Sequence, residues 1–145
     1  MALMYLWDSN ILRHYGEDHP TLRLHVQRVS WAEIAIPSVV VAEVLRGRCE
    51  FALKAPPEKA ALAHSLLAET QKYLTRFNQL LFDDKCAKAL EELKQQHKAH
   101  KKYPDLMIAA MAKVGKHVVV TRNQKDFANL LPPNQLANWI DIEPA

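Results

Sequence analysis

Four acidic residues lie far apart in this chain, and each adjoins an apolar segment: Asp8, Glu43, Asp105 and Asp126. A carboxylate that is removed from water without a partner costs several kcal/mol, so an acid beside a core segment needs a counter-charge. One divalent cation can serve several carboxylates at once. The pattern therefore predicts a shared metal site, provided that the fold brings the four acids together.

Two of the acids follow predicted strands. Asp8 comes directly after residues 3–7, an apolar run that is too short for a core helix. Asp126 lies in a polar turn after residues 118–121, a β-branched run typical of a buried parallel strand. We expect both acids at strand ends.

The other two acids lie on predicted helices. Glu43 stands among valines in a helix that we expect to begin at the N-cap Ser38 and to end near Gly47. A glutamate in the middle of a helix has no capping role. Asp105 lies in the first turn of a helix that ends at Gly115, where the helix dipole alone would also favour a carboxylate.

The remaining segments complete an alternation of strands and helices. Ser9 and Asn10 can cap a short helix that ends at Gly16. We expect further elements at 19–29 (helix), 34–36 (strand), 58–81 and 85–99 (two amphipathic helices, read as a hairpin), and 139–142 (edge strand).

This alternation predicts an α/β fold: one three-layer α/β/α domain over residues 1–145, with a central, mainly parallel sheet. Ligands of such sheets bind beyond the carboxyl ends of the strands. The four acids are therefore expected to face one crevice.

Composition fits an ordinary soluble domain. The chain has 145 residues, of which 49% are hydrophobic, and a formal net charge of +3. We expect no membrane span, no signal peptide and a cytoplasmic location, because the only N-terminal apolar run is short and leads into Asp8. Cys49 and Cys86 lack the spacing of a zinc site, so we read them as free thiols.

Basic residues gather near the acids. Lysines and histidines crowd residues 85–102, just before Asp105, and arginines follow the first two acidic segments. Positive charge around a metal site suits a polyanionic substrate. For residues 85–102 alone, a solvated helix face is the simpler interpretation.

Four blocks of sequence resemble the PIN-domain nucleases, particularly the VapC-type toxins of bacterial toxin–antitoxin pairs. The blocks are 6–12 (LWDSNIL), 36–44 (IPSVVVAEV), 104–112 (PDLMIAAMA) and 120–127 (VTRNQKDF). They occur in family order, and the last two are the most specific.

The resemblance implies a Mg²⁺- or Mn²⁺-dependent endoribonuclease. It places Asp8, Glu43 and Asp105 around the metal, with Asp126 as an outer contributor. Residues that hold the carboxylates in place would be Asn10, Thr121 and Asn123, and contacts to RNA phosphate or to the antitoxin would come from Arg13, Arg46 and Arg122.

One departure leaves the fourth acid open. Asn123 stands where some relatives carry aspartate, so that role falls to Asp126, to Asn123 as a neutral ligand, or to neither. The resemblance also implies a small antitoxin partner and a homodimer, with the amphipathic 58–99 region as a candidate dimer surface.

Two other functions compete with this one. A PIN-like protein that has lost catalysis would act as an RNA- or protein-binding module. A phosphate-binding or receiver-like domain is disfavoured, because the three glycines form no phosphate loop and Arg122 stands where a receiver needs lysine.

Overall fold

The computed structural model describes residues 2–145 and contains one five-stranded sheet, in which every pairing is parallel. The strand order is β3-β2-β1-β4-β5. The strands are β1 (Tyr5–Trp7), β2 (Ile34–Pro37), β3 (Asn78–Leu80), β4 (Val118–Val120) and β5 (Leu136–Ala137). The predicted α/β fold with a parallel sheet is confirmed.

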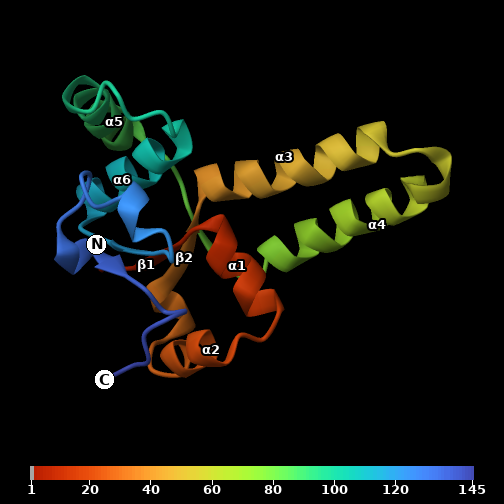
Figure 1. The fold of residues 1–145 in the computed structure, drawn as a ribbon, viewed down its shortest axis with the longest axis horizontal. Coiled ribbons are helices and arrows are strands. Elements are labelled where there is room, and N and C mark those ends of the chain that lie inside the picture. Colours follow the sequence, from red (N-terminus) through yellow and green to blue (C-terminus); the bar gives the residue numbers. More distant parts are fainter. Residues whose placement is uncertain (1) are drawn as a thin grey trace.

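Six α-helices surround the sheet (Figure 1). In this view α5 and α6 lie on one side of the sheet, α1 and α2 lie on the other, and α3 and α4 project as a long hairpin. The helices are α1 (Ser9–Gly16), α2 (Pro20–Val26), α3 (Ser38–Lys54), α4 (Pro57–Leu74), α5 (Asp84–Gln96) and α6 (Tyr103–Gly115). Three short 3₁₀ helices are η1 (Trp31–Glu33), η2 (Gln124–Asp126) and η3 (Pro133–Gln135).

The central strands are buried because their side chains are almost entirely apolar. Leu6 pairs with Ala35 on one side and with Val119 on the other, and all three are 0% exposed. Strand β1 therefore lies at the centre of the core. Its register brings the residues that follow β1 and β4 side by side, which sets the position of the site.

Helix α3 continues past the glycine at which we expected it to end. Gly47 lies inside α3, with no atom within 4 Å of the place that a Cβ would occupy. A single glycine costs a helix only about 1 kcal/mol relative to alanine. The extensive packing of α3 against α4 offsets that cost.

The expected hairpin of residues 58–99 is wrong in its pairing. Helix α4 ends at Leu74 and leads into the edge strand β3, which separates α4 from α5. Helix α4 packs instead on α3, to which a short proline-rich connection joins it, and α5 packs on α6.

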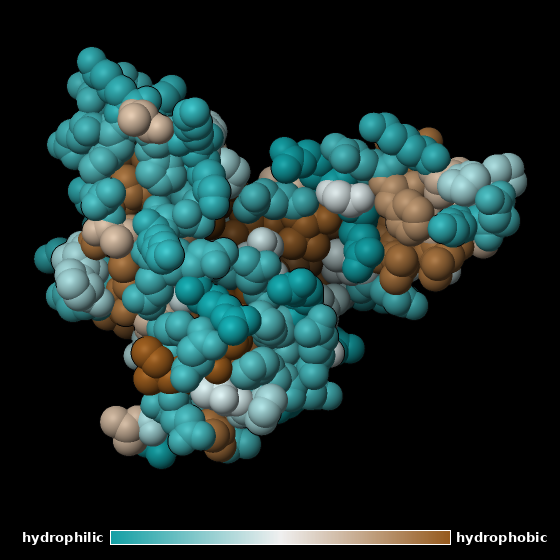
Figure 2. All heavy atoms as spheres, viewed as in Figure 1, coloured by the Kyte–Doolittle hydropathy of each residue, from teal (hydrophilic) through white to brown (hydrophobic). Residues whose placement is uncertain are grey.

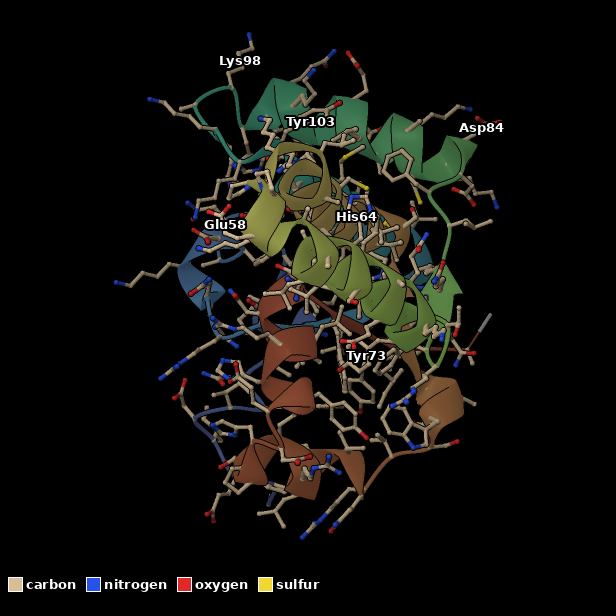
Figure 3. All side chains as sticks on the ribbon, turned by 90° about the vertical axis from the view of Figure 1, so that its right-hand side faces the viewer. Glu58, His64, Tyr73, Asp84, Lys98 and Tyr103 are labelled. Carbon is tan, nitrogen blue, oxygen red and sulfur yellow. The ribbon has the colours of Figure 1, made fainter. Side chains whose placement is uncertain are left out.

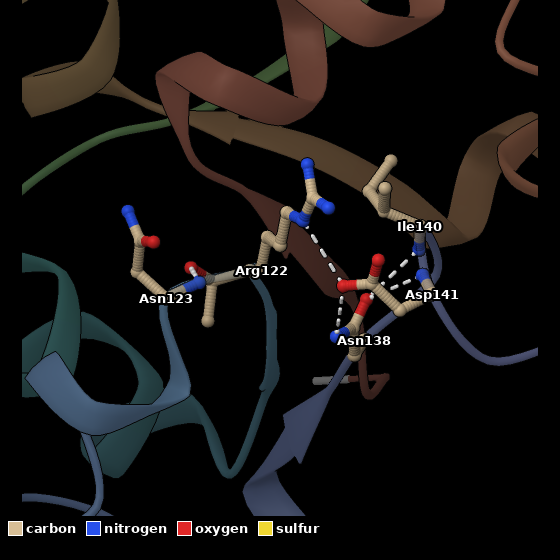
Figure 4. Close-up of polar contacts among 6 residues, drawn as sticks. Arg122, Asn123, Asn138, Ile140 and Asp141 are labelled. Atoms are coloured by element: carbon tan, nitrogen blue, oxygen red, sulfur yellow. Dashed lines mark hydrogen bonds and ion pairs between the residues drawn. The ribbon is translucent and has the colours of Figure 1, made fainter.

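The last predicted strand, 139–142, is also wrong. The fifth strand is β5, and a turn follows it in which the side-chain oxygen of Asn138 accepts hydrogen bonds from the backbone N–H groups of Ile140 and Asp141, both at 3.0 Å (Figure 4). Asparagine commonly forms this type of turn. Across residues 2–145, no helix has both the length and the apolar character needed to span a bilayer.

Candidate active site at the carboxyl edge of the sheet

Asp8 follows β1 and is 9% exposed. Its Oδ1 accepts a hydrogen bond from the backbone N–H of Ile11 at 3.1 Å, so Asp8 is the N-cap of α1. The expectation that Ser9 or Asn10 caps this helix is therefore wrong, because both already lie within it. Burial raises the pKa of Asp8, and hydrogen bonds from the Thr121 hydroxyl and from Ile11 partly offset this effect.

Glu43 lies in the middle of α3 and is half-buried. It lines a cleft of about 560 Å³ that α1, α3 and α4 enclose. Burial raises the pKa of Glu43, and the charge of Asp8 adds to this rise, whereas Arg46 opposes it. The charge of Asp8, at the start of α1, therefore acts on Glu43 in α3.

Asp105 lies in the first turn of α6 and is the most strongly perturbed of the four acids. Its Oδ2 is buried and has no hydrogen-bond partner within residues 2–145. Burial raises the pKa of Asp105 to about 6, and the charges of Asp126 and Glu43 also raise it, against the opposing charges of Lys102 and His100. A buried carboxylate oxygen without a partner is costly, so it marks a place where a cation would be stabilising.

Asp126 lies in η2 and has a counter-ion of its own. The Nζ of Lys102 lies 2.9 Å from its Oδ2. This hydrogen bond raises the pKa of Lys102. The backbone carbonyl of Asp126 also lies 3.1 Å from Nε2 of His100. The chain thus already neutralises Asp126, unlike Asp105.

The sequence did not lead us to expect that Lys102 and His100 contact Asp126. Both fall in the stretch that we read as a solvated face, and both lie more than 20 residues from Asp126 in sequence. No local pattern marks that pairing. It arises because the connection before α6 passes beside η2.

The three residues expected to support the carboxylates have different environments. Thr121 is fully buried, and its hydroxyl bonds to Asp8 and accepts the backbone N–H of Asn123 at 3.0 Å. Asn10 contributes a backbone hydrogen bond to Asp8. The side chain of Asn123 is exposed and points away from the Arg122–Asp141 pair (Figure 4).

The three arginines expected to meet RNA or the antitoxin are all exposed. Arg13 lines the same cleft as Glu43. Arg46 lies one turn after Glu43 on α3. The Nε of Arg122 donates to Asp141 at 3.1 Å, which directs Arg122 toward the C-terminal turn (Figure 4).

The four acids are thus coupled by their charges. The charge of Asp8 raises the pKa of Glu43. The charges of Glu43 and Asp126 raise the pKa of Asp105. Across residues 2–145, however, no three acidic, histidine or cysteine side chains are grouped closely enough to hold a metal ion. The donor set itself, hard carboxylate oxygens with one orphaned and buried, suits Mg²⁺ or Mn²⁺.

Comparison with known families agrees with this geometry. The model of the PIN domain family matches residues 5–130, which include all four acids. Among curated proteins, none matches the sequence significantly.

Several solved structures share the fold. A toxin–antitoxin complex from Klebsiella pneumoniae is 23% identical, with 95% of this chain and 99% of that chain covered and a TM-score of 0.68. DNA-bound VapBC from Salmonella typhimurium is 21% identical, with 95% and 99% covered and a TM-score of 0.72. VapBC2 from Rickettsia felis, bound to a promoter DNA fragment, is 26% identical, with 94% and 99% covered and a TM-score of 0.68.

Proposed function

Because the chain belongs to the PIN domain family, a family of nucleases, we propose that it is a metal-dependent endoribonuclease and the toxin of a toxin–antitoxin pair. The observation that carries this proposal is Asp105, whose buried Oδ2 has no partner in residues 2–145 and whose pKa is raised to about 6. A structural carboxylate would have a hydrogen-bond donor or a counter-ion. In residues 2–145, Oδ2 of Asp105 has no hydrogen-bond donor and its carboxylate has no ion pair within 4.0 Å, although the charges of Lys102 and His100 act on it.

In this proposal Asp8, Glu43 and Asp105 hold Mg²⁺ or Mn²⁺. When bound, such an ion would supply an activated water and would neutralise the charge that develops at the scissile phosphate. The chain's own residues prepare the site for it. Hydrogen bonds from Ile11 and Thr121 fix the orientation of Asp8 as it leaves the sheet.

Asp126 takes an outer role in this scheme. Its ion pair with Lys102 holds Asp126 beside the site, where its charge raises the pKa of Asp105. Asp126 therefore orders the edge of the site, while Arg13 and Arg46 provide positive charge beside Glu43 for the phosphates of RNA.

The proposed partners are suggested by solved structures that share this fold. Several structures with this fold are toxin–antitoxin complexes, and on this basis we assign the chain a small antitoxin partner and a cytoplasmic location. We also assign it a homodimeric state. Exposed leucines on the α3–α4 hairpin, Leu53 at 83% and Leu62 at 56%, offer apolar surface for a protein contact, and Figure 2 shows apolar side chains gathered over the outer hairpin.

RNA cleavage tests the proposal. We expect the purified protein to cleave RNA when Mg²⁺ or Mn²⁺ is added, and a chelator to stop the reaction. Asp105→Asn should lower the rate by about a thousandfold or more, because it removes a charged ligand while keeping the side chain's shape. Equal cleavage by Asp105→Asn and wild type contradicts the site. A protein that binds RNA without cleaving it, with every metal tried, is instead the inactive binding module.

A further inference from the structure

The segment that joins α5 to α6, residues 97–102, holds Asp126 at two points. The Nζ of Lys102 lies 2.9 Å from Oδ2 of Asp126, and Nε2 of His100 lies 3.1 Å from the backbone carbonyl oxygen of Asp126. A carbonyl oxygen can only accept, so Nε2 of His100 is the donor. Figure 3 shows Lys98 of the same segment pointing away from the protein. Lys102 thus turns toward the candidate site, whereas Lys98 turns toward solvent.

The backbone of Lys102 ties this contact to Asp105. Lys102 is the N-cap residue of α6, and its carbonyl accepts hydrogen bonds from the backbone N–H groups of Asp105 at 3.1 Å and of Leu106 at 3.3 Å. The first turn of α6 therefore fixes the backbone of Lys102 next to that of Asp105. From this position the side chain of Lys102 reaches Asp126 in η2.

The ammonium group of Lys102 acts on the carboxylates of both aspartates. The hydrogen bond and the charge of Asp126 raise the pKa of Lys102, and the charge of Asp105 adds to this rise. Burial and the charge of Asp126 raise the pKa of Asp105, and the charge of Lys102 is the largest effect that opposes them. The chain therefore already places one positive charge beside both carboxylates.

An ammonium group and a divalent cation compete for the same carboxylate oxygen. While Oδ2 of Asp126 accepts from Lys102, an ion that binds this carboxylate must also break the ion pair. The side chains of Lys102 and Asp126 are 63% and 27% exposed, so water screens the pair and its contribution is small. The competition should therefore change the affinity for an ion by severalfold rather than by orders of magnitude.

We propose that Lys102 is a built-in counter-ion of Asp126 and thereby determines which acids bind the metal. With Lys102 in place, Asp126 is not a ligand, and the carboxylates that bind the ion are those of Asp8, Glu43 and Asp105. Without the ammonium group, Asp126 becomes a fourth carboxylate ligand. This inference rests on the proposed function. Lys102 is a positioning residue, because it acts on the ion through Asp126.

Mn²⁺ binding to the full chain, measured by isothermal titration calorimetry, tests the role of Lys102 without a cleavage assay. Lys102→Met should raise the Mn²⁺ affinity by about fivefold, the upper end of the effect of an exposed ion pair. Lys102→Arg keeps the charge and should stay within about twofold of the wild type. In the Asp126→Asn background, Lys102→Met should raise the affinity by less than about twofold. The matched control is Lys101→Met, since Lys101 is exposed and, in residues 2–145, has no carboxylate within 4.0 Å.

Crystals of the Lys102→Met protein grown with Mn²⁺ give a second measurement. The anomalous peak of manganese should then have a carboxylate oxygen of Asp126 among its ligands, whereas in the wild type Asp126 should stay paired with Lys102. The substitution changes an exposed side chain and leaves the backbone cap of α6 in place, so we expect the variant to fold.

The outcomes separate this inference from the proposed function. If the wild type binds Mn²⁺ and cleaves RNA, but Lys102→Met and Lys101→Met have the same affinity, the role of Lys102 is wrong and the proposed function stands. An equal gain from Lys102→Met with and without the Asp126 carboxylate shows a general effect of charge and also overturns the inference. So does a wild-type crystal in which Asp126 binds the ion. If the wild type neither binds Mn²⁺ nor cleaves RNA with metal, both proposals fail.

Discussion

The acids at the sheet edge and the acid in the C-terminal turn have opposite environments. Asp141 accepts hydrogen bonds from Asn138 at 2.9 Å and from Arg122 at 3.1 Å, and the Asn138 bond in particular lowers its pKa (Figure 4). Asp105 has a buried oxygen without a partner, and burial and neighbouring acids raise its pKa to about 6. Both residues are aspartates, so the opposite directions of their pKa shifts come from their surroundings.

The fold thus supplies hydrogen-bond donors to carboxylates that have only a structural role. Asp83 shows the same behaviour as Asp141, because it caps α5 by accepting from the backbone N–H of Cys86 at 2.9 Å and its pKa is lowered. At the sheet edge, by contrast, Asp8, Glu43 and Asp105 all have raised pKa values. An unfavourable cluster of this kind is typical of functional sites.

The largest expected difference between the two regions is in activity. Glu43→Gln should reduce metal-dependent RNA cleavage by about a thousandfold, because it removes a proposed metal ligand. Asp141→Asn should change the rate by less than about twofold, since it alters an exposed turn. Rates measured side by side with one RNA check this contrast. Similar losses in both variants would show that the two sets of acids do not differ in role.

Metal binding at the sheet edge should stabilise the folded protein. With Mn²⁺ at about 100 times its dissociation constant, the free energy of unfolding should rise by about 2.7 kcal/mol. For a chain of this length that corresponds to a Tm increase of about 5–10 °C. Asp105→Asn should lose this shift and Asp141→Asn should keep it. Thermal melts with and without metal give the result, and an equal shift in both variants places the ion elsewhere.

Asp8 combines features of both regions, because it caps a helix and belongs to the proposed metal site. Asparagine caps a helix about as well as aspartate, whereas alanine cannot accept the Ile11 hydrogen bond. Asp8→Ala should therefore be about 1 kcal/mol less stable than Asp8→Asn. Both should be inactive. Chemical denaturation and cleavage assays measure the two effects separately, and an active Asp8→Asn protein would leave Asp8 with the capping role alone.

A further contrast is expected in the pH dependence of stability without metal. The folded-state pKa of Asp105, about 6, exceeds its ordinary value of 3.8, so the folded protein binds the extra proton between these pH values. The contribution of Asp105 should therefore increase the free energy of unfolding as the pH falls from about 7 to about 4. Asp105→Asn should lack this contribution. Denaturation with a chelator present, at several pH values, compares the two, and identical pH profiles would contradict the raised pKa.

Much of the fold could be predicted because burial leaves a clear pattern. Strands β1, β2 and β4 are nearly all apolar, and each was expected within one or two residues of its observed bounds. Strand β3, Asn78–Leu80, was missed because it lies at the edge of the sheet and is largely exposed, so it has no apolar run. The pairing of α4 with α3 was missed because α3 was expected to end near Gly47, whereas it continues to Lys54 and only two residues join it to α4.

The candidate site, like the fold, could be predicted only in part. Asp8, Glu43 and Asp105 could be selected because each adjoins an apolar segment. The capping bond of Asp8 to Ile11 is local and was open to prediction, since aspartate is a preferred N-cap residue. The Lys102–Asp126 ion pair could not be predicted, because only the tertiary structure brings these two side chains together.

In the proposed function, the spread carboxylates of the sheet edge converge on a divalent cation. Crystals grown with Mn²⁺ test it directly, since the anomalous signal of manganese locates the ion. The account predicts a peak bound by carboxylate oxygens of Asp8, Glu43 and Asp105, with Asp126 still paired to Lys102. A peak only at other acids, or none at saturating Mn²⁺ with the three carboxylates apart, would contradict it.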